Sequence, residues 1–408
     1  MNQAGHNNTG FWGRPWSYAH GAVINLSLVF LGLIIEVLFA GKLLLRLVYP
    51  LNVYVLVGFV AITILLHFSL RQTEFLSNFC GVKHSLCIVA LIGCLSLVGG
   101  ILPQDDHVFP HLALFGLTHI FSSWPFLFIV CLLFIQLGLV ILRHPRELSK
   151  KSIAFYCNHL GLWIVVAAMC FGAGDIQRFR IELEEGKYSW VGLDNNDQAY
   201  ELPFAIKLDD FSLTEYAPEI VLVKQSENKQ KIVGKNTILA NKGATGKLDN
   251  FLVDVLEYYP SAVFFGGKYV EIASPMAVHA ALLKITDLST AIVTEEWVST
   301  SGMGGIAKAL ELSSELKIGM LRPKPKEFLS KIEIITKDKE KFASLELRVN
   351  QPYRLKDWNI YQTSYDEEKG KWSTISVVEA IKDPWLPLVY LGMILMLIGA
   401  TMIGLIRA

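Results

Sequence analysis

The chain has 408 residues, of which 52% are hydrophobic and only 18% are charged, and its mean hydropathy is +0.40. This composition is too apolar for a soluble protein of that length and favours a membrane protein. The 37 basic residues balance the 37 acidic ones, so we expect no nucleic-acid partner.

Six apolar stretches are long enough to cross a bilayer, which takes about 20 residues. They cover residues 21–41, 51–70, 84–102, 117–142, 153–173 and 385–406. The first is too long and too far from the start to be a removable signal peptide, and no small-residue cleavage site precedes Glu36. We therefore expect an integral membrane protein with an α-helical bundle of about six transmembrane helices.

Charged residues are concentrated between the fifth and sixth stretches. Residues 176–383 hold 27 of the 37 Lys and Arg residues and 31 of the 37 Asp and Glu residues. This distribution predicts a large polar domain over 176–383, followed by a C-terminal transmembrane helix over 384–408.

The basic residues of the short loops predict the orientation, because Lys and Arg accumulate on the cytoplasmic side. With both termini in the cytoplasm, Lys42 and Arg46 lie outside and oppose the rule. Eight basic residues then lie inside: Arg14, Arg71, Lys83, Arg143, Arg146, Lys150, Lys151 and Arg407. The domain 176–383 is accordingly extracytoplasmic, and we expect it in the periplasm of a bacterium, anchored in the inner (cytoplasmic) membrane.

Cysteine usage excludes two classes of protein. The polar domain has no cysteine, so it cannot act as a thiol–disulfide carrier. The chain has no CxxC or CxxCH motif, which excludes a thioredoxin-like enzyme and a c-type cytochrome with attached haem. All six cysteines lie in or beside the spans: Cys80, Cys87, Cys94, Cys131, Cys157 and Cys170.

Within the polar domain, runs of alternating or β-branched residues predict strands separated by turn-forming residues. We expect a mainly β domain, either an antiparallel sandwich or an open barrel. A helix around Gly305–Ser313 is an alternative for that segment, and the fold of about 225–325 is left open. The clearest strand-like runs are Ile220–Val223, Leu252–Val255, Lys268–Ile272, Lys331–Ile335 and Ser344–Val349.

The residues of the same domain indicate a binding domain rather than an enzyme. Its one histidine, His279, has no cysteine to join it in a metal site and cannot by itself complete a catalytic triad. Its carboxylates are dispersed among lysines, as on a solvated surface. We expect no self-contained active site in this chain.

Short motifs follow one another in a fixed order from residue 84 to the C-terminus. The spans carry Gly99–Gln104, Phe115–Leu117, Ser123–Leu127 and Asn158–Leu162. The polar domain opens with Glu184–Gly186 and Leu202–Phe211, and it closes with Arg348–Pro352, Ile360–Tyr365 and Lys382–Trp385. In this order the motifs resemble the ResB (Ccs-type) family of system II cytochrome c biogenesis, and the string at 202–211 is the most specific match.

The resemblance implies a subunit of the system II cytochrome c synthetase. Such a subunit assists haem export and haem attachment to apocytochrome c together with a ResC/CcsA-type haem-handling membrane protein. That partner must be separate, because the nine Trp residues of this chain are scattered. Two features depart from the family: an N-terminal extension (1–82) with two extra helices precedes the ResB-like transmembrane core (83–175), and residues 225–325 share little with it. The extra helices either help assembly or are inert anchors.

His159 is the candidate haem ligand. A ligand-forming side chain inside a bilayer is by default a functional candidate. Tyr156 and Trp163, at i−3 and i+4, share its helix stripe, where a porphyrin needs apolar walls. The resemblance implies that His159 binds the iron of haem b in transit. The alternative is a buried histidine hydrogen-bonded to a neighbouring helix, with Gly161 allowing close packing.

The other polar residues near the spans are weaker candidates. Interfacial solvation accounts for His67 and His84, and Glu36 is expected to extend to the membrane surface. Three more histidines belong to a loop region, and we expect water to solvate them: His107, His111 and His119.

Two other functions compete with haem delivery. A non-enzymatic membrane-anchored scaffold or sensor would use the periplasmic domain to bind a peptide or an envelope component, and it would not co-purify with haem. A transporter or quinone-linked redox protein calls for several intramembrane charges, and the spans offer almost none. The sequence does not identify the second axial ligand, the apocytochrome served or the stoichiometry.

Overall fold

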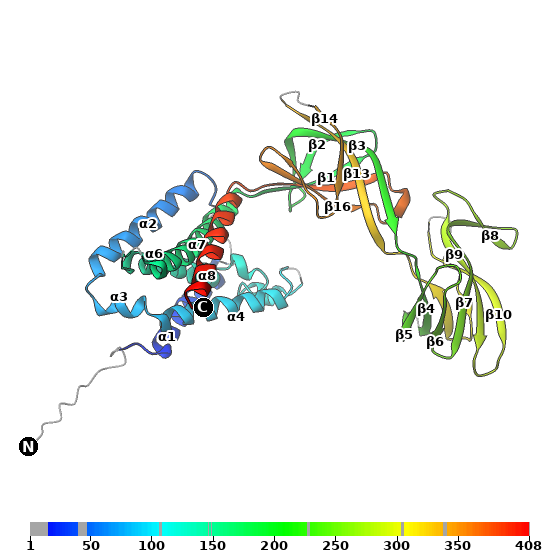
Figure 1. Ribbon diagram of the computed structural model, residues 1–408, viewed down its shortest axis with the longest axis horizontal. Helices are drawn as coiled ribbons and strands as arrows, with labels where there is room; N and C mark the ends of the chain where they lie inside the picture. The colour runs from blue at the N-terminus through cyan, green and yellow to red at the C-terminus, as the bar shows by residue number, and fades with distance from the viewer. Residues whose placement is uncertain are drawn as a thin grey trace, which may run out of the picture. The chain divides into compact units, whose positions relative to one another are not determined.

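The computed structural model describes residues 15–39, 47–105, 108–145, 147, 149–226, 229–302, 306–337 and 341–407. Two compact units divide the chain. One is formed by Met1–Ile176 and Asp383–Ala408, and the other by Gln177–Lys382. The first unit is helical and the second is built from β-strands (Figure 1).

Six helices of the first unit are long and apolar enough to cross a membrane. The predicted architecture, with a β-rich domain between the fifth and sixth of these helices, is confirmed. The six are α1 (Tyr18–Phe39), α2 (Leu51–Leu70), α4 (Val82–Ile101), α6 (Trp124–Arg143), α7 (Lys150–Gly172) and α8 (Leu386–Arg407). Four shorter helical segments lie between them: α3 (Glu74–Phe79), α5 (Pro110–Ala113), η1 (Ile120–Ser122) and η2 (Ala173–Asp175).

The fourth span begins at Trp124, later than the residue 117 expected from hydropathy. Gly116 has a φ of +69°, and η1 then makes a separate turn before the helix starts. Pro125 occupies the first turn of α6, where its missing N–H would have no partner in the helix anyway.

The two helices of the N-terminal extension are packed into the bundle. In α1, Gly32 lies so close to α6 that a Cβ there would be 2.6 Å from the backbone of Pro125. In α2, the side chain of Asn52 donates to the carbonyl oxygen of Phe171 in α7 at 2.9 Å. Both helices are therefore structural parts of the bundle rather than separate anchors.

A hydrogen-bond network around Asp175 joins three helix ends. Its Oδ2 accepts from the amide of Asn52 and from the indole of Trp385, each at 2.7 Å. Its Oδ1 accepts from the backbone N–H of Tyr49 at 2.7 Å. Hydrogen bonds to a carboxylate are among the stronger ones. The network fixes the end of α7 to the start of α8, the two helices between which the β-rich domain is inserted.

The first lobe of the β-rich unit is an eight-stranded antiparallel sheet of order β14-β13-β3-β2-β1-β17-β16-β15. Alternate residues of β3 are buried, as a strand with one face on a core requires. Because β14 also contacts β16, the sheet curls around one core and forms an open barrel. The strands are β1 (Gln177–Glu184), β2 (Tyr188–Leu193), β3 (Ala199–Glu215), β13 (Pro325–Thr336), β14 (Lys341–Arg348), β15 (Tyr353–Leu355), β16 (Trp358–Tyr365) and β17 (Ile375–Lys382).

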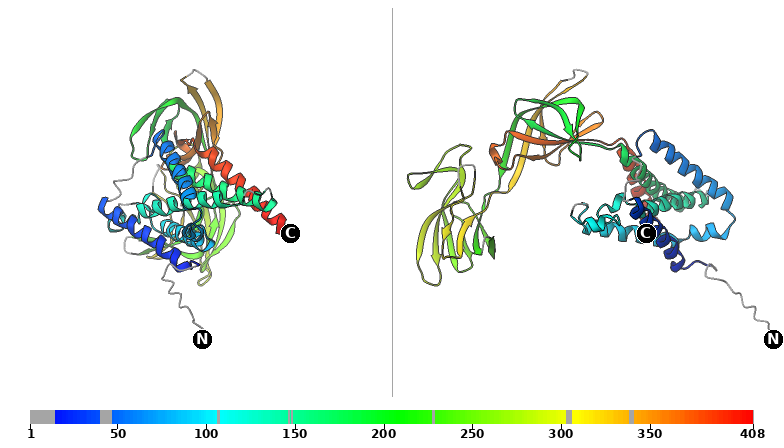
Figure 2. Two further views of the ribbon diagram at one scale, coloured as in Figure 1. Left: turned by 90° about the vertical axis from the view of Figure 1, so that its left-hand side faces the viewer. Right: turned by 180° about the vertical axis from the view of Figure 1, so that it is seen from behind.

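The second lobe lies in sequence between β3 and β13, which pair antiparallel and run side by side (Figure 2). It is a sandwich of a five-stranded sheet, β10-β9-β7-β6 with β8 on β7, and a four-stranded sheet, β11-β12-β4-β5. A separate hydrophobic core fills it. Its strands are β4 (Glu219–Ser226), β5 (Lys229–Leu239), β6 (Thr245–Leu248), β7 (Phe251–Phe265), β8 (Lys268–Glu271), β9 (Val278–Asp287), β10 (Val293–Ser299), β11 (Leu310–Glu311) and β12 (Leu316–Met320).

The β-rich unit thus contains both architectures expected from the sequence, an open barrel and a sandwich. The five predicted strand runs fall on β4, β7, β8, β13 and β14, and two of them extend one residue past the strand, at Ile272 and Val349. The alternative of a helix around Gly305–Ser313 is wrong for the described residues 306–313, which contain the strand β11. The sandwich lies in the region of about 225–325 whose fold the sequence left open.

Candidate functional site around His159

Helix α7 carries all three predicted site residues. It starts where the hydroxyl of Ser149 accepts from the backbone N–H of Ser152 at 3.1 Å, a regular N-cap. One side of α7 is closed by α8, because a Cβ on Gly161 would lie 2.6 Å from the carbonyl oxygen of Gly392. Small residues at this crossing let the two backbones approach.

The hydrogen bond of His159 defines its protonation. Its Nδ1 lies 2.9 Å from the carbonyl oxygen of Phe155. A carbonyl oxygen only accepts, so Nδ1 carries a proton. In the neutral ring, Nε2 then holds the lone pair, and it has no hydrogen-bond partner within the described residues. The imidazole is half-buried, and Nε2 is its one nitrogen with a lone pair.

Two residues that the sequence analysis did not single out orient this imidazole. The ring of Phe155 stacks on His159 with centroids 3.9 Å apart and planes 23° apart. On the other face of Phe155, the ring of His144 stacks at 3.7 Å and 12°. The sequence carries a signal for each residue: Phe155 lies four residues before His159, on the same side of the helix, and His144 precedes α7 in the chain.

Tyr156 and Trp163 make their main contacts away from the imidazole. The hydroxyl of Tyr156 donates to the carbonyl oxygen of His144 at 3.1 Å, with the two rings edge to face. The indole N–H of Trp163 donates to the carbonyl oxygen of Phe134 at 3.1 Å, and its ring stacks on Phe134 at 4.8 Å. Both side chains therefore hold α7 against α6 and the segment that follows it.

Solvation at a span end does not account for His84, which is 1% exposed. Its Nε2 lies 3.2 Å from the side-chain oxygen of Asn25, and its Nδ1 lies 2.9 Å from the carbonyl oxygen of Phe79. The side-chain nitrogen of Gln136 is 3.1 Å from the same Nδ1. His84 is thus part of a polar cluster that ties α1, α4 and α6 together. His111 is exposed in α5, and His107 lies outside the described residues.

Glu36 does not reach the membrane surface, contrary to expectation, because its carboxylate has partners inside the bundle. The side chain is fully buried. One oxygen lies 2.9 Å from Nε2 of His119, and the other accepts from the backbone N–H of Trp124 at 2.9 Å. Glu36 therefore caps the N-terminus of α6, where the helix dipole favours a negative charge.

Within the described part of the chain, no three or more His, Cys, Asp and Glu side chains gather as ligands for a metal ion. Haem iron has a different requirement. The porphyrin supplies four equatorial nitrogens, so the protein needs to give only one or two axial ligands. One imidazole nitrogen is enough to give an axial ligand, and Nε2 of His159 is the candidate.

These features define a multi-pass membrane protein with a large β-rich domain between its last two membrane helices. The ResB-like family model matches residues 313–381, which include β12 to β16 and nearly all of β17. The chain is therefore similar to ResB-like proteins over this part of the domain, which confirms the resemblance and supports a role in cytochrome c biogenesis. The motifs Arg348–Pro352 and Ile360–Tyr365 lie inside the match, and those before residue 313 lie outside it. No curated protein matches the chain.

Proposed function

We propose that this chain is the large-domain subunit of a system II cytochrome c synthetase in a bacterial inner membrane. It helps pass haem b outward and holds apocytochrome c in the periplasm beside a ResC/CcsA-type partner. The observation that carries the proposal is the ResB-like match at residues 313–381. In this proposal thioether formation, which joins the CxxCH thiols of apocytochrome c to haem, belongs to the complex.

In this proposal His159 is one axial ligand of the haem in transit. The carbonyl oxygen of Phe155 holds the proton on Nδ1 and leaves Nε2 for the iron. The stack of His144, Phe155 and His159 limits rotation of the imidazole, so little side-chain entropy is lost when the iron binds. In this proposal Tyr156 and Trp163 keep α7, and with it His159, in position through their hydrogen bonds to His144 and Phe134. The second axial ligand comes from the partner.

Co-purification of haem tests the function. The full chain is expressed with and without its ResC/CcsA-type partner, extracted in mild detergent, and examined by visible absorption spectroscopy. We expect a haem spectrum with the intact complex and cytochrome c maturation that depends on both chains. If the complex never carries haem and cytochrome c matures normally without this chain, the proposal is contradicted, and a scaffold or sensor is then favoured.

A further inference from the structure

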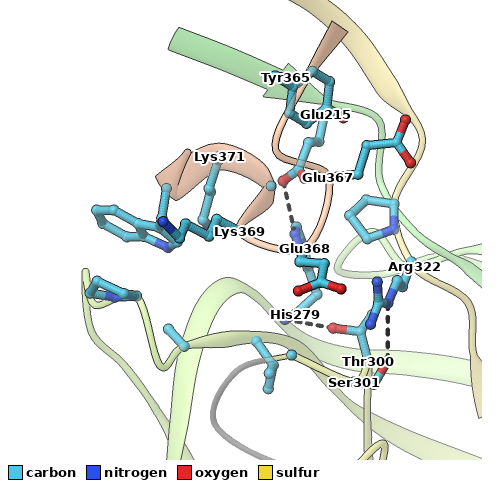
Figure 3. A pocket seen from close by; sticks show the side chains of 17 residues that line it. Glu215, His279, Thr300, Ser301, Arg322, Tyr365, Glu367, Glu368, Lys369 and Lys371 are labelled. Atoms are coloured by element: carbon cyan, nitrogen blue, oxygen red, sulfur yellow. Dashed lines mark hydrogen bonds and ion pairs between the residues drawn. The ribbon is translucent and has the colours of Figure 1, made fainter. Parts of the chain in front are cut away.

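A pocket in the β-rich domain lies where its two lobes meet, and segments far apart in sequence line it (Figure 3). The end of β3 contributes Glu215, and the start of β9 contributes His279. Residues 300–302 follow β10, and residues 322–323 follow β12. The loop after β16, which contains η3 (Gly370–Trp372), closes one side.

Glu215 and His279, which line the pocket, form one hydrogen-bonded chain with Tyr258, which does not belong to the lining. Nε2 of His279 lies 3.2 Å from a carboxylate oxygen of Glu215, and Nδ1 lies 2.8 Å from the hydroxyl of Tyr258. The side chains of His279 and Glu215 are only 10% and 15% exposed. Figure 3 shows Glu215 and His279 pointing toward each other across the pocket. The negative charge of Glu215 is thereby held in place at the junction of the lobes.

The loop after β16 brings donors to the pocket. The indole Nε1 of Trp372 is buried and has no hydrogen-bond partner among the described residues. The ammonium of Lys371 lies 5.9 Å from the centre of the Trp372 ring and donates to the carbonyl oxygen of Pro260 at 2.7 Å. Burial lowers the pKa of Lys371, against the opposing effect of Glu215. A buried donor without a partner is costly, so a bound acceptor would be favourable.

The lining as a whole fits neither a simple anion nor a simple cation. It carries three basic residues and three carboxylates, so these charges balance. Aromatic rings and prolines supply apolar walls. The basic residues are Arg322, Lys369 and Lys371, the acidic ones are Glu215, Glu367 and Glu368, and the apolar walls include Tyr365, Trp372, Pro275 and Pro323. A peptide combines main-chain donors and acceptors with side chains that pack on such walls.

We propose that this pocket binds an extended peptide segment, and that the peptide belongs to apocytochrome c. The identity of the peptide rests on the proposed function, whereas its chemical class rests on the pocket itself. The Trp372 indole donates to a carbonyl oxygen of the peptide, and the charged residues pair with its polar groups.

The test uses the full chain in lipid nanodiscs and a fluorescent synthetic apocytochrome c peptide that contains the CxxCH motif. Trp372→Phe removes the N–H and keeps most of the ring, and Lys371→Met removes the ammonium. We expect each change to weaken peptide binding, measured by fluorescence anisotropy, by about 5- to 10-fold, the effect of one lost hydrogen bond. The matched control Lys268→Met, at an exposed lysine of β8, should bind like the unchanged chain.

Haem spectra of the same variants, prepared with the partner, separate the two proposals. Weaker peptide binding with unchanged haem supports the pocket. Equal binding by all folded variants, or no binding by the unchanged chain, overturns it even if haem is present. Haem absent from every preparation, with peptide binding still dependent on Trp372 or Lys371, would contradict the haem-delivery function and leave the peptide site standing. A scrambled peptide that binds as well would overturn only the assignment to apocytochrome c.

Discussion

Nδ1 of His159 is bound to the carbonyl oxygen of Phe155, one helical turn earlier, at 2.9 Å. That oxygen belongs to the backbone, so the hydrogen bond survives most substitutions of Phe155. The Phe155 ring has a separate role, because it lies between His159 and His144. The two contributions to the site can therefore be separated by mutation.

Phe155→Leu should keep the hydrogen bond of His159 and lose the ring stack. Aromatic pairs contribute about 0.5–1.5 kcal/mol, so we expect haem to bind about 2- to 10-fold more weakly, but not to be lost. Haem titration of the purified complex, followed by absorbance, measures this. Phe68→Leu, at an exposed position of α2, is the control and should leave the titration unchanged. Identical titration curves for Phe155→Leu and the unchanged protein would show that the stack does not support the ligand.

Gly161→Ala should separate α7 from α8. The new Cβ would lie 2.6 Å from the carbonyl oxygen of Gly392, a distance at which the backbone has to move. Overpacking of this kind costs about 1–3 kcal/mol. We expect a lower melting temperature in detergent, measured by intrinsic fluorescence. Gly404→Ala, in α8, meets no atom within 4 Å and should melt like the unchanged protein.

Glu36→Leu should destabilise the bundle, because His119 and the N–H of Trp124 would lose their buried acceptor. An N–H that loses its acceptor inside the bundle, here that of Trp124, costs about 1–3 kcal/mol. We expect less folded protein in the membrane and a lower melting temperature. Glu36→Gln keeps one acceptor oxygen and should fall between Leu and Glu. If Leu and Glu were equally stable at position 36, the capping role would be wrong.

Hydropathy was sufficient to predict the membrane helices, and strand periodicity was sufficient to predict that the polar domain is mainly β. A run of about 20 apolar residues has few alternatives to a spanning helix. Apolar and polar residues alternate along β3, and this pattern predicts a strand equally directly. The buried apolar residues are Leu202, Phe204, Ile206 and Leu208. The candidate ligand His159 was also visible, because a histidine inside an apolar span stands out.

Partners distant in sequence were not predictable from one chain. The sequence predicts that Glu36 extends to the surface, because its partner His119 lies 83 residues away in the chain. His279 is an isolated histidine in the sequence, because Glu215, its partner in the fold, lies 64 residues away. The insertion of a whole sandwich between β3 and β13 leaves no local signal, because the two paired strands are separated by more than one hundred residues.

The orientation of the chain in the membrane is predicted from the loop charges alone. Reporter domains fused at residues 180 and 300 should be active only if they function in the periplasm. A cytoplasmic reporter that works at either site would reverse the orientation. A fusion near residue 48 is the sharpest test, because Lys42 and Arg46 oppose the rule there.

The central claim, that His159 binds haem iron, is tested most directly by the haem spectrum of the complex carrying His159→Ala. We expect the variant to insert in normal amounts, to lose most of the haem that co-purifies, and to fail in cytochrome c maturation. Added imidazole should partly restore both, because it can occupy the vacated coordination position. Unchanged haem content and normal maturation in His159→Ala would contradict the account. Reduced insertion that is rescued by Asn or Gln, but not by imidazole, would show instead that His159 is a structural hydrogen-bonding residue.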